Sequence, residues 1–296
     1  MLKRDGIDEL IDRLESGGNH RVLRRLTVLD GRTSQPYDNG PTFIGAVVDV
    51  ETTGTDTAND RVIELALRRF RYDAAGRILK LDRMWSWRED PGIPLDPKIV
   101  QLTGISDADL TGQSIDEGAA VRLLTSTHLI VAHNAAFDRK FVERRFPKAG
   151  GLAWCCSCFE VDWPSFGMEP GKLGWLAAQA GFYFDAHRAS NDVDAVVALL
   201  QHTLGAGRTV LSELMDSARC PSVKIEAVGA SFAVKDALRT RGYKWDANNK
   251  VWWREVGAGD LIDEEAWLAR SVYGPDCGST SLGPRFTEIT ARERYA

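Results

Sequence analysis

Residues 47–54, VVDVETTG, begin as a buried strand and then carry two acids, Asp49 and Glu51, with Val50 between them. Side chains alternate between the two faces of a strand, so both carboxylates project to the same side, about 7 Å apart along the chain. Two carboxylates on one face repel each other and lose hydration unless something positive lies between them. Either the strand ends one residue early, with both acids in water, or it delivers both acids to a cation.

The pattern around this stretch predicts an α/β domain at residues 42–206. Apolar or alternating runs predict five strands, and amphipathic runs between the later strands predict helices. Three strands followed by alternating helices and strands are typical of a mixed sheet flanked by helices. The five runs expected as strands are FIGAVVDV, RVIELALRRF, RILKLDRMWSW, THLIVAHN and LAWCCSCF.

Four further segments flank this domain. Residues 1–41 carry short helical patterns and a turn-rich linker, and residues 207–222 are expected to form a second linker. Residues 223–273 predict a small α+β unit with a strand, a helix, a hairpin and a closing helix. The polar residues 274–296, with their Gly and Pro, are expected to form a flexible tail.

The composition is that of an ordinary globular protein, with a net charge of -5 and no apolar run long enough to span a membrane. The N-terminal run MLKRDGIDELIDRLESG is acidic in the middle, unlike a signal peptide. Five cysteines, three of them in CCSC at 155–158, point away from a secreted disulfide framework, so we expect a cytoplasmic protein. A zinc site would need a fourth ligand at recognisable spacing, so buried strand cysteines are the favoured interpretation.

Two more carboxylates and one imidazole are placed to join Asp49 and Glu51. Asp138, in AHNAAFDRKF, lies early in a helix that follows a buried strand. His187 and Asp192, in HRASND, lie in a loop and at the start of the last helix. Hard divalent cations prefer oxygen ligands, and a two-metal site needs about four carboxylates plus phosphate oxygens of the substrate. Each motif alone is weak evidence, whereas the three in this order favour a metal site strongly.

Glu64 is a weaker candidate. It alternates with apolar neighbours on the second predicted strand, so it is placed to face the rim of the site. A structural role is the favoured interpretation.

DVETTG, HNAAFD and HRASND resemble the three motifs of the DEDDh (DnaQ-like) 3′→5′ exonucleases. This family includes the epsilon proofreading subunit of DNA polymerase III, ribonuclease T and oligoribonuclease. The resemblance covers residues 42–206 and implies a ribonuclease H-like fold and two Mg²⁺ or Mn²⁺ ions per active site. The sister DEDDy group has a Tyr four residues before the last Asp, where this chain has Arg188.

The resemblance also implies a role for each motif residue. It implies that His187 is the catalytic general base, and an imidazole suits that role because it titrates near neutral pH. The implied metal ligands are Asp49, Glu51, Asp138 and Asp192. The backbone after the strand is expected to approach the terminal nucleotide, with substrate contacts at Thr52, Thr53 and Gly54.

Residues 223–256 carry seven Lys or Arg and four Asp or Glu, a net charge of +3 within an acidic chain. Aromatic residues are interleaved with these charges, and stacking plus positive charge holds single-stranded nucleic acid without sequence preference. Strand alternation assigns Trp252 and Arg254 to an exposed face, so Trp252 is the predicted substrate-binding residue here. The other face is expected to supply the core that a small unit needs. Its expected members are Tyr243, Trp245, Val251 and Trp253.

The favoured function is release of nucleoside monophosphates from the 3′ ends of single-stranded DNA, in proofreading, repair or DNA turnover. An exoribonuclease of the ribonuclease T or oligoribonuclease kind would use the same chemistry. A third alternative is a subunit that acts mainly by binding a polymerase or repair partner, although all five motif residues are present, which argues against an inactive scaffold. The expected partner is a nucleic acid 3′ end, with DNA favoured over RNA, and no membrane.

Overall fold

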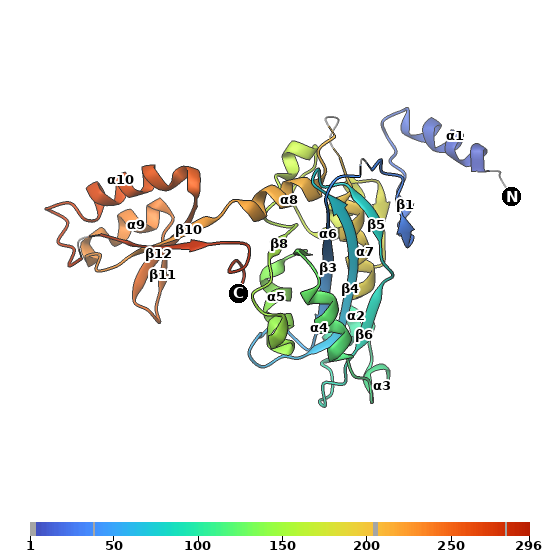
Figure 1. Ribbon diagram of the computed structural model, residues 1–296, viewed down its shortest axis with the longest axis horizontal. Coiled ribbons are helices and arrows are strands. Elements are labelled where there is room, and N and C mark those ends of the chain that lie inside the picture. Colours follow the sequence, from blue (N-terminus) through green and yellow to red (C-terminus); the bar gives the residue numbers. More distant parts are fainter. Residues whose placement is uncertain (1–3, 38, 204–206, 282) are drawn as a thin grey trace. The chain divides into compact units, whose positions relative to one another are not determined.

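The computed structural model describes residues 4–37, 39–203, 207–281 and 283–296 (Figure 1). Contacts along the chain divide it into one unit of residues 1–215 with 295–296 and a second unit of residues 216–294. Among the described residues, none of the helices combines the length and the apolar character that crossing a bilayer requires.

A mixed sheet forms the centre of the first unit, as the sequence predicts. Its strand order is β2-β5-β4-β3-β7-β8, and β6 also pairs with β4. β3 is antiparallel to β4 and parallel to β7, and β7 is parallel to β8. The strand bounds are β2 Gly31–Arg32, β3 Thr42–Thr52, β4 Val62–Asp73, β5 Ile78–Leu81, β6 Trp85–Arg88, β7 Leu129–Ala132 and β8 Trp154–Cys156.

This sheet has seven strands in the described part of the chain, so the predicted number of five is too low. The run expected as one strand, RILKLDRMWSW, divides into β5 and β6, which pair with different parts of β4. The two-residue strand β2 comes from the predicted N-terminal extension and pairs with β5. Short edge strands of this kind carry too little periodic pattern to be recognised in a sequence.

Helices cover both faces of this sheet. On one face, Ala46, Val48 and Val50 of β3 pack with Leu124 and Phe141 from two helices, α4 and α5. On the other face, α7 packs against β3 and β4. The helix bounds are α1 Arg4–Glu15, α2 Pro97–Thr103, α3 Asp107–Leu110, α4 Glu117–Thr125, α5 Ala135–Arg145, α6 Leu173–Gln179, α7 Ala189–Leu200 and α8 Val210–Arg219.

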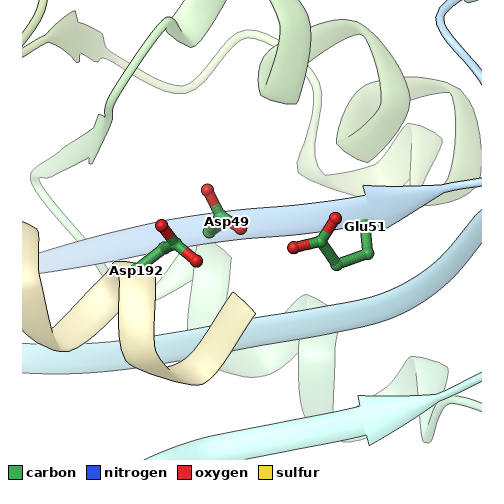
Figure 2. A group of neighbouring side chains, drawn as sticks. All are labelled: Asp49, Glu51 and Asp192. Carbon is green, nitrogen blue, oxygen red and sulfur yellow. The ribbon is translucent and has the colours of Figure 1, made fainter. Parts of the chain in front are cut away.

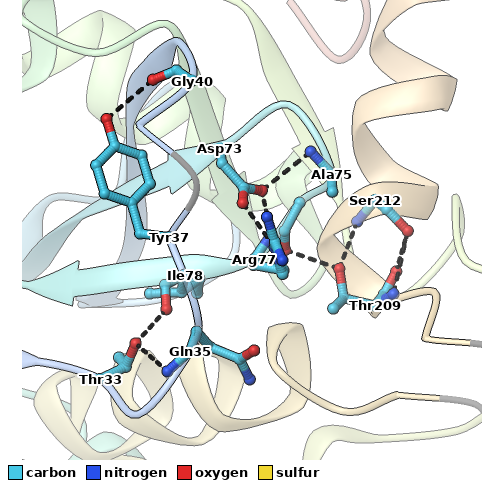
Figure 3. A network of polar contacts seen from close by, with 11 residues as sticks. Thr33, Gln35, Tyr37, Gly40, Asp73, Ala75, Arg77, Ile78, Thr209 and Ser212 are labelled. Atoms are coloured by element: carbon cyan, nitrogen blue, oxygen red, sulfur yellow. Dashed lines mark hydrogen bonds and ion pairs between the residues drawn. The ribbon is translucent and has the colours of Figure 1, made fainter.

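Residues 207–222, expected as a linker, instead contain helix α8. Thr209 precedes this helix and is buried, and its Oγ1 donates to the carbonyl oxygen of Gly76 at 2.8 Å (Figure 3). Gly76 lies in the β4–β5 turn, where the Asp73 carboxylate accepts from the backbone N–H of Ala75 and from Arg77. A hydrogen bond therefore connects the start of α8 to the β4–β5 turn of the sheet.

The N-terminal extension also differs from the expectation, because it contains strands as well as a helix. Besides α1 and β2, strand β1 (Arg24–Arg25) pairs in parallel with β9 (Phe182–Tyr183). The cysteine-rich run behaves as expected, since Cys155 and Cys156 are buried in β8. The segment before residue 42 is thus joined to the first unit at two places.

The second unit is a four-stranded antiparallel sheet with two helices on one face (Figure 1). Its strand order is β11-β12-β10-β13. Asp246 accepts from the backbone N–H groups of Asn248 and Asn249, which closes the predicted hairpin between β11 and β12. The bounds are β10 Ser222–Ala227, α9 Lys235–Arg241, β11 Lys244–Asp246, β12 Val251–Gly257, α10 Leu261–Ser271 and β13 Arg285–Ile289.

Two expectations for this unit differ from the structure. Residues 274–296, expected as a flexible tail, include β13, which pairs with β10 and would be hard to recognise from its polar sequence. The assignment of faces in the hairpin was also wrong. Tyr243 and Val251 are buried, but Trp245 is 49% exposed, and Trp252 packs against the core cluster instead. Trp245 and Trp252 are direct partners across the strands, so they share a face.

Candidate active site

Strand β3 carries Asp49 and Glu51 to one side of the sheet. Val48 and Val50 point into the core beneath α4 and α5, so strand alternation directs the two acids to the opposite side. On β4, Glu64 lies directly opposite Glu51. Asp49 and Glu51 are half-buried, so the strand does not simply end in water.

Asp192 completes a three-carboxylate group, defined here as Asp49, Glu51 and Asp192. Each residue offers an oxygen, and these oxygens all lie within 4.8 Å of one another. Figure 2 shows Asp192 projecting from α7 towards the two acids on β3. Asp192 lies in the first turn of α7, and its Oδ2 accepts from the backbone N–H of Arg188 at 3.1 Å. This hydrogen bond fixes the carboxylate at the helix start, where negative charge is favourable.

Asp138 lies beside this group. It is buried in the first turn of α5, and its Oδ1 accepts from the backbone N–H of Val50 at 3.1 Å. The parallel pairing of β3 with β7 ends at Val47, so Val50 lies beyond it and needs another acceptor. Asp138 therefore holds the end of β3 in place, and its charge acts on Asp49.

Burial raises the pKa of all four carboxyls, and the charges of neighbouring acids raise it further for Asp49, Glu51 and Asp138. The pKa of Asp49 lies well above its usual range, through burial first and then the charge of Asp138. Burial, assisted by the charge of Asp192, raises the pKa of Glu51 to about 8. Burial raises the pKa of Asp138 to about 8 and that of Asp192 to about 6. The four groups cannot all be ionised near neutral pH unless positive charge enters the site.

His187 lies exposed in the loop directly before α7. Its backbone is left-handed, with φ of 63°, which is uncommon for a residue other than glycine. The charge of His187 partly offsets the effect of burial on the pKa of Asp192, so the imidazole interacts with this carboxylate. The structure therefore brings the five motif residues to one end of β3, from four separate elements.

Glu64 makes more contacts at the site than the sequence indicated. It is only 2% exposed, and its carboxylate accepts from the backbone N–H of Ala189 at 3.2 Å and from Nη2 of Arg188 at 3.4 Å. Nε of Arg88 lies 3.6 Å away. Glu64 thus ties the start of α7, next to His187, to β4. The available signal was an acid within the otherwise apolar run VIELAL.

Polar side chains at the end of β3 and in the following loop form hydrogen bonds within that segment. Oγ1 of Thr52 donates to the carbonyl oxygen of Gly54 at 2.5 Å, and Oγ1 of Thr53 donates to Oδ1 of Asp60 at 2.8 Å. A Cβ on Gly54 would collide with the Asp60 carboxylate, so packing within the loop is enough to account for a glycine at this position. Substrate contacts at these residues and at Trp252, which belongs to the second unit, stay predictions.

Comparison with known protein families decides the identity of this unit. The model of the exonuclease family matches residues 46–200, more than half of the chain, and this range contains all five motif residues. The chain belongs to the exonuclease family. This confirms the DEDDh assignment made from the three motifs.

Individual proteins that resemble this chain match it over only part of their length or of its own. DNA polymerase III PolC-type from Bacillus cereus is 42% identical over 106 residues, which are 35% of this chain and 7% of that protein. Ribonuclease T from Shewanella frigidimarina is 29% identical over 122 residues, 36% of this chain and 55% of that protein. Among solved structures, E. coli exonuclease I in complex with a dA16 oligonucleotide has a TM-score of 0.47 at 17% identity, covering 85% of this chain and 64% of that one.

The three-carboxylate group fits a divalent cation. Carboxylate oxygens are the ligands that hard cations prefer, and these three converge from a strand and a helix that are held by hydrogen bonds. Arg188 lowers the pKa of Glu51, yet burial and the neighbouring acids outweigh it. The site therefore carries a surplus of negative charge that a bound cation would neutralise.

The raised pKa values predict how the stability of the cation-free protein depends on pH. Glu51 and Asp138 have folded pKa values of about 8, whereas ordinary Asp and Glu titrate near about 4. The folded protein then holds protons that the unfolded chain has released, so this contribution to stability is lost as pH rises from about 4 to 8. In calorimetry, Mg²⁺ or Mn²⁺ should raise the unfolding temperature more at pH 8 than at pH 5.

A matched pair of variants controls this measurement. Glu51→Gln should weaken both the pH dependence and the response to the cation, whereas Glu169→Gln, which removes an exposed carboxylate from the same unit, should leave both unchanged. A cation response that is the same at both pH values, or that is undiminished in Glu51→Gln, would contradict this account of the site.

Proposed function

We propose that the chain is a divalent-cation-dependent 3′→5′ exonuclease that releases nucleoside monophosphates from single-stranded DNA. The observation that carries the proposal is the convergence of Asp49, Glu51 and Asp192 oxygens within 4.8 Å, in a domain of the exonuclease family. Phosphodiester hydrolysis needs positive charge near the scissile phosphate, and this group is arranged to hold it.

Each residue has a distinct proposed role. Asp49, Glu51 and Asp192, with Asp138 beside them, would hold two Mg²⁺ or Mn²⁺ ions. Such ions supply electrostatic stabilisation of the phosphate and of the leaving 3′ oxygen. His187 would take the proton of the attacking water, since it is exposed to solvent and an imidazole accepts protons near neutral pH.

Supporting residues would keep this base in position. Glu64 binds Arg188 and the backbone of Ala189, the two residues that follow His187. The loop that carries the base is therefore anchored on one side to a buried carboxylate. The turn at Thr52, Thr53 and Gly54 directly follows the acids on β3, which supports the expectation that it meets the terminal nucleotide.

RNA is the second candidate substrate. The ribonuclease T relative shares 55% of its length with this chain, a larger share of a whole protein than the 7% of the PolC-type relative. The PolC-type similarity, in turn, is the observation behind a role beside a polymerase. Because the active-site chemistry is the same in each case, only substrate comparison separates these alternatives.

Cleavage of matched 5′-labelled DNA and RNA single strands in Mg²⁺ tests the proposal. Labelled products should shorten from the 3′ end, faster for DNA than for RNA, and activity should vanish with EDTA. Asp192→Asn should abolish turnover because it replaces a charged cation ligand with a neutral group of similar shape. The control Glu169→Gln should keep wild-type activity. Activity in excess EDTA, or release of the 5′ label as a mononucleotide at the earliest times, would overturn the proposal.

A second prediction concerns the base. His187→Ala should lower kcat by about 10²–10⁴-fold, the usual contribution of general base catalysis, because water then has no proton acceptor. Cation binding, measured by titration calorimetry, should be retained because the carboxylates are intact. An unchanged kcat in His187→Ala would assign the base to another residue.

A further inference from the structure

The second unit contains a pocket with a volume of about 450 Å³, within the range of about 300–1,000 Å³ that is typical of ligand pockets. It opens between the start of α9 and the β11–β12 hairpin. Three aromatic and two basic side chains contribute to its wall. The lining residues are Ala230, Ser231, Phe232, Lys235, Arg239, Trp245 and Trp252.

The three aromatic side chains of this pocket differ in how far they are buried. Trp245 and Trp252 lie opposite each other on the two strands, with ring centroids 5.5 Å apart and planes tilted by 57°. Trp252 is half-buried against the core of the unit, whereas Trp245 is 49% exposed. Phe232 is 79% exposed. Trp252 is thus fixed by packing, whereas Trp245 and Phe232 are exposed enough to contact a ligand.

Core packing does not account for these rings. The core of the second unit is already formed by apolar side chains from its sheet and helices, including Ile225, Leu238 and Leu268. Phe232 and Trp245 lie outside this cluster. Because Phe232 and Trp245 are exposed and line the same pocket, both are placed to contact a ligand that enters it.

The charge of the pocket is positive. Nζ of Lys235 lies 3.9 Å from the centroid of the Phe232 ring, and Arg239 follows one turn later on α9. Arg239 pairs with Asp236 at 3.6 Å, but both side chains are more than two-thirds exposed, so the pair is weak. Among the described residues, those that line the pocket include no acid.

We propose that this pocket binds an unstacked base of single-stranded nucleic acid, with Lys235 and Arg239 on the neighbouring phosphates. Aromatic faces beside cations are suited to bases and phosphates together. A duplex would not offer a free base face to the rings, and an apolar peptide would gain nothing from the two cations. The proposal rests on the proposed function in taking a nucleic acid strand as ligand, and it assigns the contact to Phe232, Trp245 and Trp252.

The test is a binding measurement on the full chain in EDTA, where cleavage does not occur. Fluorescence anisotropy is recorded with labelled oligothymidylate, oligouridylate, a duplex, and an abasic strand of equal length and charge. Trp245→Ala and Phe232→Ala remove exposed rings and should preserve the fold, which circular dichroism checks. Ile262→Ala, which removes an equally exposed apolar side chain from α10 of the same unit, is the control.

Each ring variant should lose about 5- to 150-fold in affinity for the single strands, the usual range for one stacked base. The abasic strand should bind weakly and equally to wild type and both variants. Lys235→Gln should reduce the slope of log affinity against log salt concentration by about one, because one phosphate contact is lost. Ile262→Ala should bind like the wild type.

The outcomes separate this proposal from the exonuclease proposal. Binding that depends on the rings would support the pocket proposal even if the wild type does not cleave in Mg²⁺. Failure to cleave would count against the exonuclease function alone. Equal single-strand affinity of wild type, Trp245→Ala and Phe232→Ala would overturn the pocket proposal and leave a protein partner as the ligand. An equal loss for single strand, duplex and abasic strand would also overturn it, because stacking on a base would then play no part.

Discussion

Mutual repulsion among carboxylates at the end of β3 is the constraint on which the rest of the first unit depends. Asp49, Glu51 and Asp192 are close enough to share a ligand, and burial makes their charged forms costly. A fold that only needed stability would place apolar residues there. The arrangement is consistent with a protein that gives up stability at this site in order to bind a cation.

Neighbouring elements hold the repelling groups in place. Asp138 binds the backbone of Val50 where the pairing of β3 with β7 has ended. Glu64 binds the start of α7, and the backbone of Arg188 binds Asp192. Each carboxylate in these contacts accepts a backbone N–H that would otherwise lack a partner, so the same hydrogen bonds that complete the secondary structure also orient the site.

The grouping of Asp49, Glu51 and Asp192 could be predicted from the sequence because it follows from local rules. Alternation on one strand places Asp49 and Glu51 on one side, and the helix that carries Asp192 has a clear apolar face. Glu64 was underestimated because its role depends on register, which puts it opposite Glu51 and beneath α7. No local pattern in RVIELAL contains that information.

The second unit was harder to predict for the same reason. Its hairpin was recognised, but the faces of Trp245 and Trp252 depend on how β11 pairs with β12, and a short loop can shift that register. Strand β13 joins the sheet from a polar segment and is defined only by its partner, β10. Individual helices and strands could therefore be predicted from the sequence better than the pairing between strands.

Titration calorimetry of Mn²⁺ binding tests most directly whether the carboxylates exist to hold a cation. The experiment compares the cation-free wild type with a double variant, Asp49→Asn with Asp192→Asn, and with Glu169→Gln as the charge control. The account predicts saturable Mn²⁺ binding in the wild type and in the control, and its loss in the double variant. Binding of equal affinity and stoichiometry in all three proteins would show that the cation lies elsewhere and would contradict the account.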